Sequence, residues 1–266
     1  MFEEVKAAFS LQSEIFDDYE EQNEILKWMR SVTREHVLKN LKRGDKILEL
    51  NAGTGLDAVY FASKGFNVHA IDISEGMIEK LKFKVNALEL QNKVTCELLS
   101  FTELHELTGR SFDYIFSNFG GLNCVDNLAK VTRHFKHILN PGGRVTFVIM
   151  PRVCPWEIAL MLKGNFRTAF RRLHQGGVNA NIEGVKFWTY YHGLHDVKKA
   201  LGKDFRLIES RGLASLSPPP YMENFPRRYS KLYHYLANLD DRVSRYFPLN
   251  RWADHIITTF EFLKNS

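Results

Sequence analysis

The segment that most constrains the fold spans residues 47–58 and reads ILELNAGTGLDA. An apolar strand there runs into a turn that contains Gly53 and Gly55, and a helical pattern follows. A second apolar strand ends on Asp72, roughly 20 residues after the turn. Two glycines in a strand-to-helix turn, followed at this distance by an acid, are typical of a Rossmann-like parallel sheet that binds an adenosine-containing cofactor.

The acidic residues of the turn distinguish between the cofactors that such a sheet can bind. Glu49 ends the strand, and Asp57 comes shortly after Gly55. These carboxylates would repel a pyrophosphate at the start of the helix, so NAD and FAD fit the turn poorly. S-adenosylmethionine has no phosphate, and its ammonium group favours a nearby carboxylate. We therefore expect S-adenosylmethionine, with Asp72 at its ribose hydroxyls; the alternative is a tight turn that is glycine-rich for backbone reasons alone.

Later segments resemble, in the same order, those of the class I S-adenosylmethionine-dependent methyltransferases. The matching segments are residues 72–77 (DISEGM), 98–101 (LLSF), 112–120 (FDYIFSNFG) and 139–145 (LNPGGRV). The resemblance covers roughly Asp45 to Met150. It departs from the family at Asn51-Ala52, where many relatives carry a glycine in the first loop position.

The resemblance also implies which residues hold the cofactor. Ile73 and Met77 would flank the adenine, the side chains after residue 98 would meet its edge, and the loop after residue 117 would lie beneath the sulfonium. The predicted cofactor-binding residues are Glu49, Asn51, Gly53, Gly55, Asp72, Ile73, Met77, Ser100, Phe101, Asn118 and Phe119.

Length and composition are ordinary for a soluble globular protein. The 266 residues are enough for one large domain or a domain with a lid, and 44% are hydrophobic while 25% are charged. No apolar run approaches the roughly 20 residues that cross a bilayer, and residues 1–10 contain no secretory apolar region. Cys96, Cys124 and Cys154 are far apart and have no metal-ligand spacing. We therefore expect a cytoplasmic protein without a metal site or disulfides.

The alternation of strands and helices predicts an α/β fold with a Rossmann-like, seven-stranded, mostly parallel sheet, an inserted lid and N-terminal helices. The order of the strands follows from the family resemblance. The predicted strands are 46–50, 67–71, 94–98, 113–117, 144–150, 205–212 and 255–263, and the predicted helices are 13–28, 31–40, 56–63, 75–87 and 126–139. The predicted parts are an N-terminal helical segment (1–44), the cofactor-binding core (45–150), the lid (151–195) and the rest of the core (196–266), with a second insertion at about 213–251.

The lid and the second insertion are basic and rich in aromatic residues. The lid has six Lys/Arg against two Asp/Glu, and the second insertion has six against three. Because the arginine fork suits carboxylates and phosphates, these segments favour an anionic acceptor, or an acidic carrier as partner. The predicted substrate contacts are Arg167, Arg171, Tyr190 and Tyr191, with Arg172 beside them. The alternative is a solvated charged face. No nucleic-acid-binding module is recognisable, so no nucleic acid is expected.

Methyl transfer from a sulfonium mainly requires that the acceptor is aligned with the methyl group. A hydroxyl acceptor also needs a base, and His192, which follows the aromatic run of the lid, is the predicted base. A structural hydrogen bond is its alternative role. We expect methylation of a small molecule at oxygen, nitrogen or a carboxylate. The alternatives are a protein or carrier-bound substrate and, disfavoured by the presence of Asp72, a non-catalytic adenosylmethionine-binding module.

Overall fold

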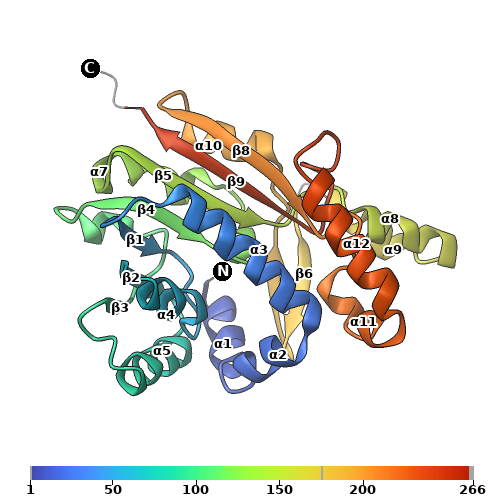
Figure 1. Ribbon diagram of the computed structural model, residues 1–266, viewed down its shortest axis with the longest axis horizontal. Helices are drawn as coiled ribbons and strands as arrows, with labels where there is room; N and C mark the ends of the chain where they lie inside the picture. The colour runs from blue at the N-terminus through green and yellow to red at the C-terminus, as the bar shows by residue number, and fades with distance from the viewer. Residues whose placement is uncertain (1, 175, 264–266) are drawn as a thin grey trace.

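The computed structural model describes residues 2–174 and 176–263 and is built on a seven-stranded sheet (Figure 1). The strand order is β3-β2-β1-β4-β5-β9-β8. The strands are β1 (Lys46–Glu49), β2 (Asn67–Asp72), β3 (Val94–Leu98), β4 (Phe112–Ser117), β5 (Leu139–Ile149), β8 (Phe205–Leu213) and β9 (His255–Phe262). The predicted α/β fold with a seven-stranded Rossmann-like sheet is confirmed.

The directions of the strands determine where a ligand can bind. Neighbouring strands from β3 through β5 are parallel, whereas β9 pairs antiparallel with both β5 and β8. The strand order reverses between β1 and β4, because β2 and β3 lie on one side of β1 while β4 and β5 lie on the other. Ligands of open parallel sheets bind beyond the carboxyl ends of the strands at such a point. Here that point follows Glu49 and Ser117, the last residues of β1 and β4.

Helices cover both faces of the sheet, as strands with apolar residues on both sides require. On one face, the strands pack against helices that lie across and below them in Figure 1. On the opposite face, a second cluster of buried apolar side chains joins the strands to another set of helices. The helices are α3 (Glu24–Asn40), α4 (Leu56–Ser63) and α5 (Glu75–Ala87) on the first face, and α6 (Ala129–Thr132), α7 (Phe135–Ile138) and α10 (Leu194–Leu201) on the second.

The crossover between β4 and β5 differs from its prediction. A single helix over 126–139 was expected, but α6 and α7 are separate short helices. The hydroxyl of Thr132, at the end of α6, donates to the carbonyl of Ala200 in α10, which fixes α6 against its neighbour. Strand β5 begins at Leu139, which pairs with Phe112, so it is longer than the strand predicted from residue 144.

The N-terminal segment contains three helices instead of the two predicted. They are α1 (Phe2–Gln12), α2 (Phe16–Gln22) and α3. The expected helix over 13–28 is divided at Asn23, whose backbone is extended and whose side chain accepts hydrogen bonds from the amides of Ile25 and Leu26. An asparagine in this position is a strong helix N-cap, so a new helix starts there rather than continuing α2.

The lid contains a β-hairpin that the sequence interpretation missed. Strands β6 (Val178–Ile182) and β7 (Val185–Thr189) pair antiparallel across the two-residue turn Glu183-Gly184, and both turn residues have positive φ. Positive φ at both positions is the geometry of a tight hairpin turn, and Glu-Gly is a weaker sequence signal for it than Asn-Gly or Asp-Gly. The remaining lid helices include α8 (Pro155–Ala159) and α9 (Phe166–Phe170).

Helix α1 connects the core to this hairpin. Val5 and Ala8 are buried with Phe187 of β7, and the rings of Phe9 and Phe187 lie 5.8 Å apart. On its other side α1 contacts α5, where the hydroxyls of Ser10 and Ser74 are 2.9 Å apart.

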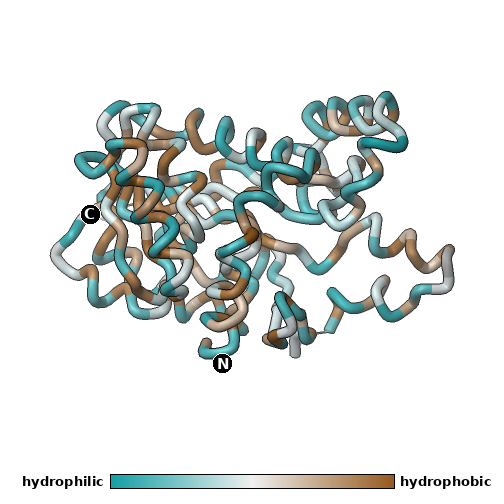
Figure 2. Tube along the Cα trace, turned by 90° about the horizontal axis from the view of Figure 1, so that it is seen from below, coloured by the Kyte–Doolittle hydropathy of each residue, from teal (hydrophilic) through white to brown (hydrophobic). Residues whose placement is uncertain are grey.

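The second insertion forms α11 (Phe225–Arg228) and α12 (Ser230–Val243), which lie beside α8 and α9 in Figure 1. Figure 2 shows hydrophobic segments running through the body of the molecule, and hydrophilic segments along many of its outer turns. Among the described residues, no helix combines the length and hydropathy needed to span a bilayer.

Candidate active site

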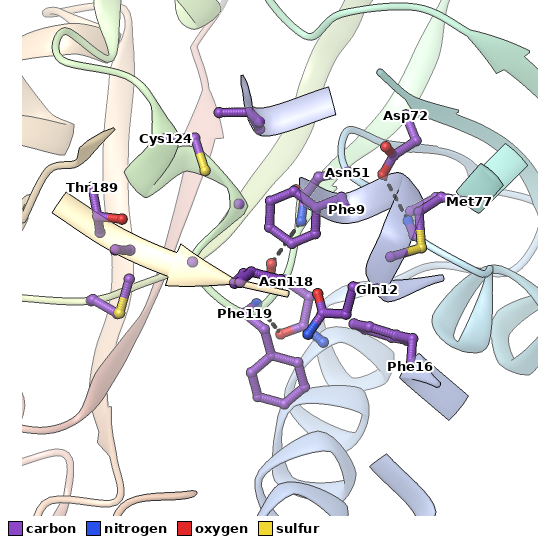
Figure 3. A pocket seen from close by; sticks show the side chains of 18 of the residues that line it. Phe9, Gln12, Phe16, Asn51, Asp72, Met77, Asn118, Phe119, Cys124 and Thr189 are labelled. Carbon is purple, nitrogen blue, oxygen red and sulfur yellow. Dashed lines mark hydrogen bonds between the residues drawn. The ribbon is translucent and has the colours of Figure 1, made fainter. Parts of the chain in front are cut away.

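A cavity of about 550 Å³ lies beyond the carboxyl ends of β1, β2 and β4. Its floor is formed by the turn after β1 and the loops after β2 and β4, and its roof by α1, α2 and the β6–β7 hairpin. In Figure 3, Asp72 and Met77 lie on one side, Cys124 and Thr189 on the opposite side, and Phe9 between them. The roof is mainly apolar, with Phe2, Val5, Phe9, Ala180, Ile182 and Phe187 lining it beside the polar Gln12, Glu20 and Thr189.

The predicted cofactor residues meet at this cavity, with one exception. The lining residues among them are Glu49, Asn51, Gly53, Asp72, Ile73, Met77, Ser100, Phe101, Asn118 and Phe119. Gly55 is not among the lining residues. It has a φ of 83° at the start of α4, and a Cβ there would lie 2.1 Å from the Leu81 side chain. Gly55 therefore permits the turn and the close packing of α4 on α5, rather than making room for the cofactor.

Asp72 is positioned by the backbone around it. Its carboxylate accepts hydrogen bonds of 2.9 Å from the amides of Gly53 and Ser74, and the residue is buried. Burial raises the pKa of Asp72, while the amides oppose that shift by stabilising the charged form. Since a carboxylate has about four lone-pair sites, Asp72 can accept further hydrogen bonds from two hydroxyls.

Glu49 carries a buried polar atom that is left without a partner. Its Oε2 makes no hydrogen bond within the described structure, although the residue lines the cavity and is 2% exposed. Burial, reinforced by the neighbouring carboxylates of Asp57 and Asp72, raises the pKa of Glu49 well above its usual value. A buried, unsatisfied carboxyl is costly unless a ligand pairs with it, so this position suits a cationic donor.

A buried ion network supports the floor beside Glu49. Arg30, which comes from α3, is paired with both Glu20 and Asp57. Asp57 also accepts from Arg34 at 2.7 Å and from the Asn118 amide at 2.7 Å. These bonds tie α3, the start of α4 and the loop after β4 together. Arg30 lines the cavity, and the sequence alone does not identify it, because its partners Glu20 and Asp57 lie on two other helices.

The pKa of Glu49 gives a testable pH dependence. The unfolded chain releases this proton near a pH of about 4.3, whereas the folded protein keeps it to higher pH. Stability should therefore fall as the pH rises from that value through the folded pKa. Glu49→Gln should remove this fall and raise the thermal midpoint of the cofactor-free protein at neutral pH.

The same variant should bind S-adenosylmethionine roughly 10-fold to 150-fold more weakly, because the amide carries no charge for the ammonium group. Thermal unfolding across pH and calorimetric titration would measure the two effects. Glu97→Gln, on partly exposed β3 outside the cavity, is the matched control. Equal behaviour of both variants would contradict a role for Glu49 in binding.

A second polar group lies at the other end of the cavity. His255, the first residue of β9, places Nδ1 2.9 Å from the Asp254 carboxylate, and both residues line the cavity. The other Asp254 oxygen accepts from Arg172 at 2.7 Å. Burial by itself raises the pKa of Asp254, but His255 and Arg172 outweigh it and hold that pKa well below its usual value. The adjacent pair Asp254-His255, at the start of the predicted strand 255–263, is the sequence signal for this group.

The structure contradicts the prediction that His192 reaches the cavity. His192 is buried, its Nε2 lies 2.7 Å from the Val125 carbonyl, and it is not among the lining residues. Tyr191 does line the cavity. Because successive side chains of an extended segment point in opposite directions, Tyr190 and His192 on either side of Tyr191 face away from it. His192 therefore has the structural hydrogen-bonding role that was its alternative.

The predicted basic substrate contacts also differ from expectation. Arg167 is exposed and does not line the cavity. Arg171 does line it, but its guanidinium makes two hydrogen bonds, of 2.8 and 2.7 Å, to Glu157. Arg172 is buried and paired with both Glu157 and Asp254. Two of the three arginines are thus occupied by carboxylates of the protein itself, which weakens the case for an anionic acceptor.

Known proteins share these features. The family model for a methyltransferase domain matches residues 47–143, which hold the turn after β1, Asp72 and the loop after β4. Over this segment the chain is similar to the class I S-adenosylmethionine-dependent methyltransferases. This similarity agrees with S-adenosylmethionine as the expected cofactor.

Several relatives of this chain are known. An uncharacterized protein of Methanocaldococcus jannaschii is 29% identical over 199 residues, covering 73% of this chain and 74% of the relative. The demethylmenaquinone methyltransferase of Leptospira interrogans is 27% identical over 145 residues, covering 52% of this chain and 57% of that enzyme. The structure of the CcbJ methyltransferase of Streptomyces caelestis is similar in fold, with a TM-score of 0.57, 17% identity, and coverage of 86% and 89% of the two chains.

The residues present fit S-adenosylmethionine. The unpaired Glu49 carboxyl suits the ammonium group, Asp72 retains lone pairs for the ribose hydroxyls, and Met77 and Phe101 offer apolar surface for the adenine. When bound, the cofactor supplies a methyl group on a sulfonium that is already an activated leaving group. The protein then has to bind it, hold the acceptor in line and exclude water.

Proposed function

We propose that this protein transfers the methyl group of S-adenosylmethionine to a small-molecule acceptor held inside the cavity. The observation that carries the proposal is the position of the cavity between the predicted cofactor residues and a cover formed by α1 and the β6–β7 hairpin. Residues that suit the cofactor line its floor, while α1 and the β6–β7 hairpin cover it with apolar side chains. About 550 Å³ is in the usual range of small-molecule sites, about 300–1,000 Å³.

Two further points support a small apolar acceptor. The name of the Leptospira relative gives demethylmenaquinone, a small molecule, as what that enzyme methylates. Arg171 and Arg172, which line the cavity, are paired with Glu157 and Asp254, so they are not free to bind an anionic acceptor there.

The proposal is tested by supplying methyl-labelled S-adenosylmethionine with a cell extract divided into small-molecule and macromolecular fractions. We expect label in the small-molecule fraction, and mass spectrometry would identify the product. Label confined to the protein fraction would support a protein or carrier-bound substrate instead. Tight cofactor binding without labelling of either fraction would support the non-catalytic alternative.

A further inference from the structure

The histidine at the start of β9 presents a free nitrogen to the cavity. His255 lines the cavity, and no hydrogen bond to its Nε2 is found among residues 2–174 and 176–263. A Cβ placed on Gly120 would lie 3.4 Å from this Nε2, and the His255 ring meets the Phe119 ring edge-on at 5.9 Å. Nε2 therefore lies next to the loop after β4, the loop expected beneath the sulfonium.

The tautomer of His255 follows from its partner. The Asp254 carboxylate, which its two partners keep ionised, can only accept hydrogen bonds. Nδ1 must then be the protonated nitrogen, and the lone pair of Nε2 faces the cavity. Arg172 donates to Asp254 through both its carboxylate and its backbone carbonyl, at 2.7 and 2.8 Å, so the carboxylate cannot turn away from the imidazole.

We propose that His255 is the general base for a hydroxyl acceptor and that Asp254 is its positioning residue. This inference rests on the proposed function and narrows its substrate class to molecules that present an ionisable O–H, such as a phenol or an enol. The acceptor oxygen bonds to the methyl carbon as the bond from that carbon to sulfur breaks, with both electrons left on sulfur. The acceptor proton passes to Nε2, and the imidazolium, stabilised by Asp254, later releases it to water.

The other ionisable groups at this end of the cavity do not compete for the role. Burial raises the pKa of Tyr191 and, more strongly, of Tyr221, so both remain protonated phenols at neutral pH. The charges of the remaining groups are paired with one another. Burial also raises the pKa of the Cys154 thiol beside Asp254, and Arg30, which lies over the Phe119 ring, is paired with Glu20 and Asp57. Among the described residues, the titratable and charged groups near the imidazole are Asp254, Arg172, Glu157, Arg171, Cys154, Tyr191, Tyr221 and Arg30.

The decisive experiment compares two probes of one shape, naphthol and naphthylamine, with methyl-labelled S-adenosylmethionine. His255→Asn should lower kcat for naphthol by roughly 10²–10⁴-fold and abolish the fall of activity at acid pH. Naphthylamine attacks with a neutral lone pair, so its rate should change by only a few-fold. His192→Asn is the matched control, and it should keep both the activity toward naphthol and the fall of that activity at acid pH. Equal losses with both probes, or none, would overturn the assignment.

A second measurement does not depend on turnover. Nitrogen NMR of the wild-type protein with bound S-adenosylhomocysteine, in mildly alkaline buffer, should show His255 protonated on Nδ1 alone. Asp254→Asn should change that tautomer while calorimetry shows unchanged cofactor affinity. A proton on Nε2 in the wild type would exclude His255 as the base. If neither probe is methylated, the proposed function fails for them, and the NMR result still decides the role of His255.

Discussion

Arg172→Met should destabilise the protein by about 3–5 kcal/mol, the usual cost of removing one partner from a buried ion pair. Arg172 is 3% exposed and contacts both Glu157 and Asp254, which are equally buried. The Cys154 sulfur and one oxygen from each of the two carboxylates lie within 4.8 Å of one another. The guanidinium of Arg172 supplies the positive charge that these closely spaced carboxylates need. Without it, Glu157 depends on Arg171 alone and Asp254 on His255 alone.

Urea unfolding would measure this effect as a lower midpoint at an unchanged slope. Arg167→Met, on the exposed side of α9, is the matched control and should stay within about 0.5 kcal/mol of wild type. Combining Arg172→Met with Glu157→Gln and Asp254→Asn should recover much of the loss, because no buried carboxylate is then left without its guanidinium partner. A wild-type midpoint for Arg172→Met alone would show that the network does not contribute to stability.

Asp72→Asn should weaken binding of S-adenosylhomocysteine roughly 10-fold to 150-fold, since the charge-assisted contacts to the ribose hydroxyls are lost. The amide also presents N–H groups toward the backbone amides of Gly53 and Ser74, which now donate to the carboxylate. The turn should loosen as well, so affinity and unfolding midpoint have to be measured on the same sample.

Asp126→Asn serves as the control for the same chemical change. Asp126 pairs with Lys130 at the surface, outside the cavity, and its replacement should leave affinity unchanged. If Asp72→Asn lowered the midpoint but bound the cofactor as tightly as wild type, Asp72 would be a turn-stabilising residue without a role in binding.

The cofactor half of the site could be predicted from sequence because its geometry is local. The turn after β1, Asp72 at the end of β2 and the loop after β4 each follow a buried strand, and parallel strands bring their carboxyl ends together. Only Gly55 was misplaced. Its positive φ is a backbone requirement of the turn, which a sequence motif does not distinguish from a requirement for ligand space.

The acceptor half could not be predicted, because its contacts join distant segments. The local charge of the lid predicts that Arg172 contacts the substrate. In the structure Arg172 is paired with Asp254, which lies 82 positions further along the chain and cannot be related to it from the sequence. His192 was chosen because it follows aromatic residues. In an extended segment, neighbouring side chains lie on opposite sides of the backbone, so a prediction that is wrong by one position selects a side chain on the wrong side. Here Tyr191, and not His192, faces the cavity. The adjacent pair Asp254-His255 marks His255 in the sequence, but the pair alone does not show that the imidazole reaches the cavity.

The roof of the cavity has a consequence for the order of synthesis. Helix α1 precedes the parallel strands in the chain, whereas the β6–β7 hairpin on which Phe9 packs is made only after β5. During translation the cofactor turn and Asp72 therefore emerge well before their cover can close. The nascent protein should gain affinity for S-adenosylmethionine late, in a single step, when residues 178–189 leave the ribosome and α1 docks on them.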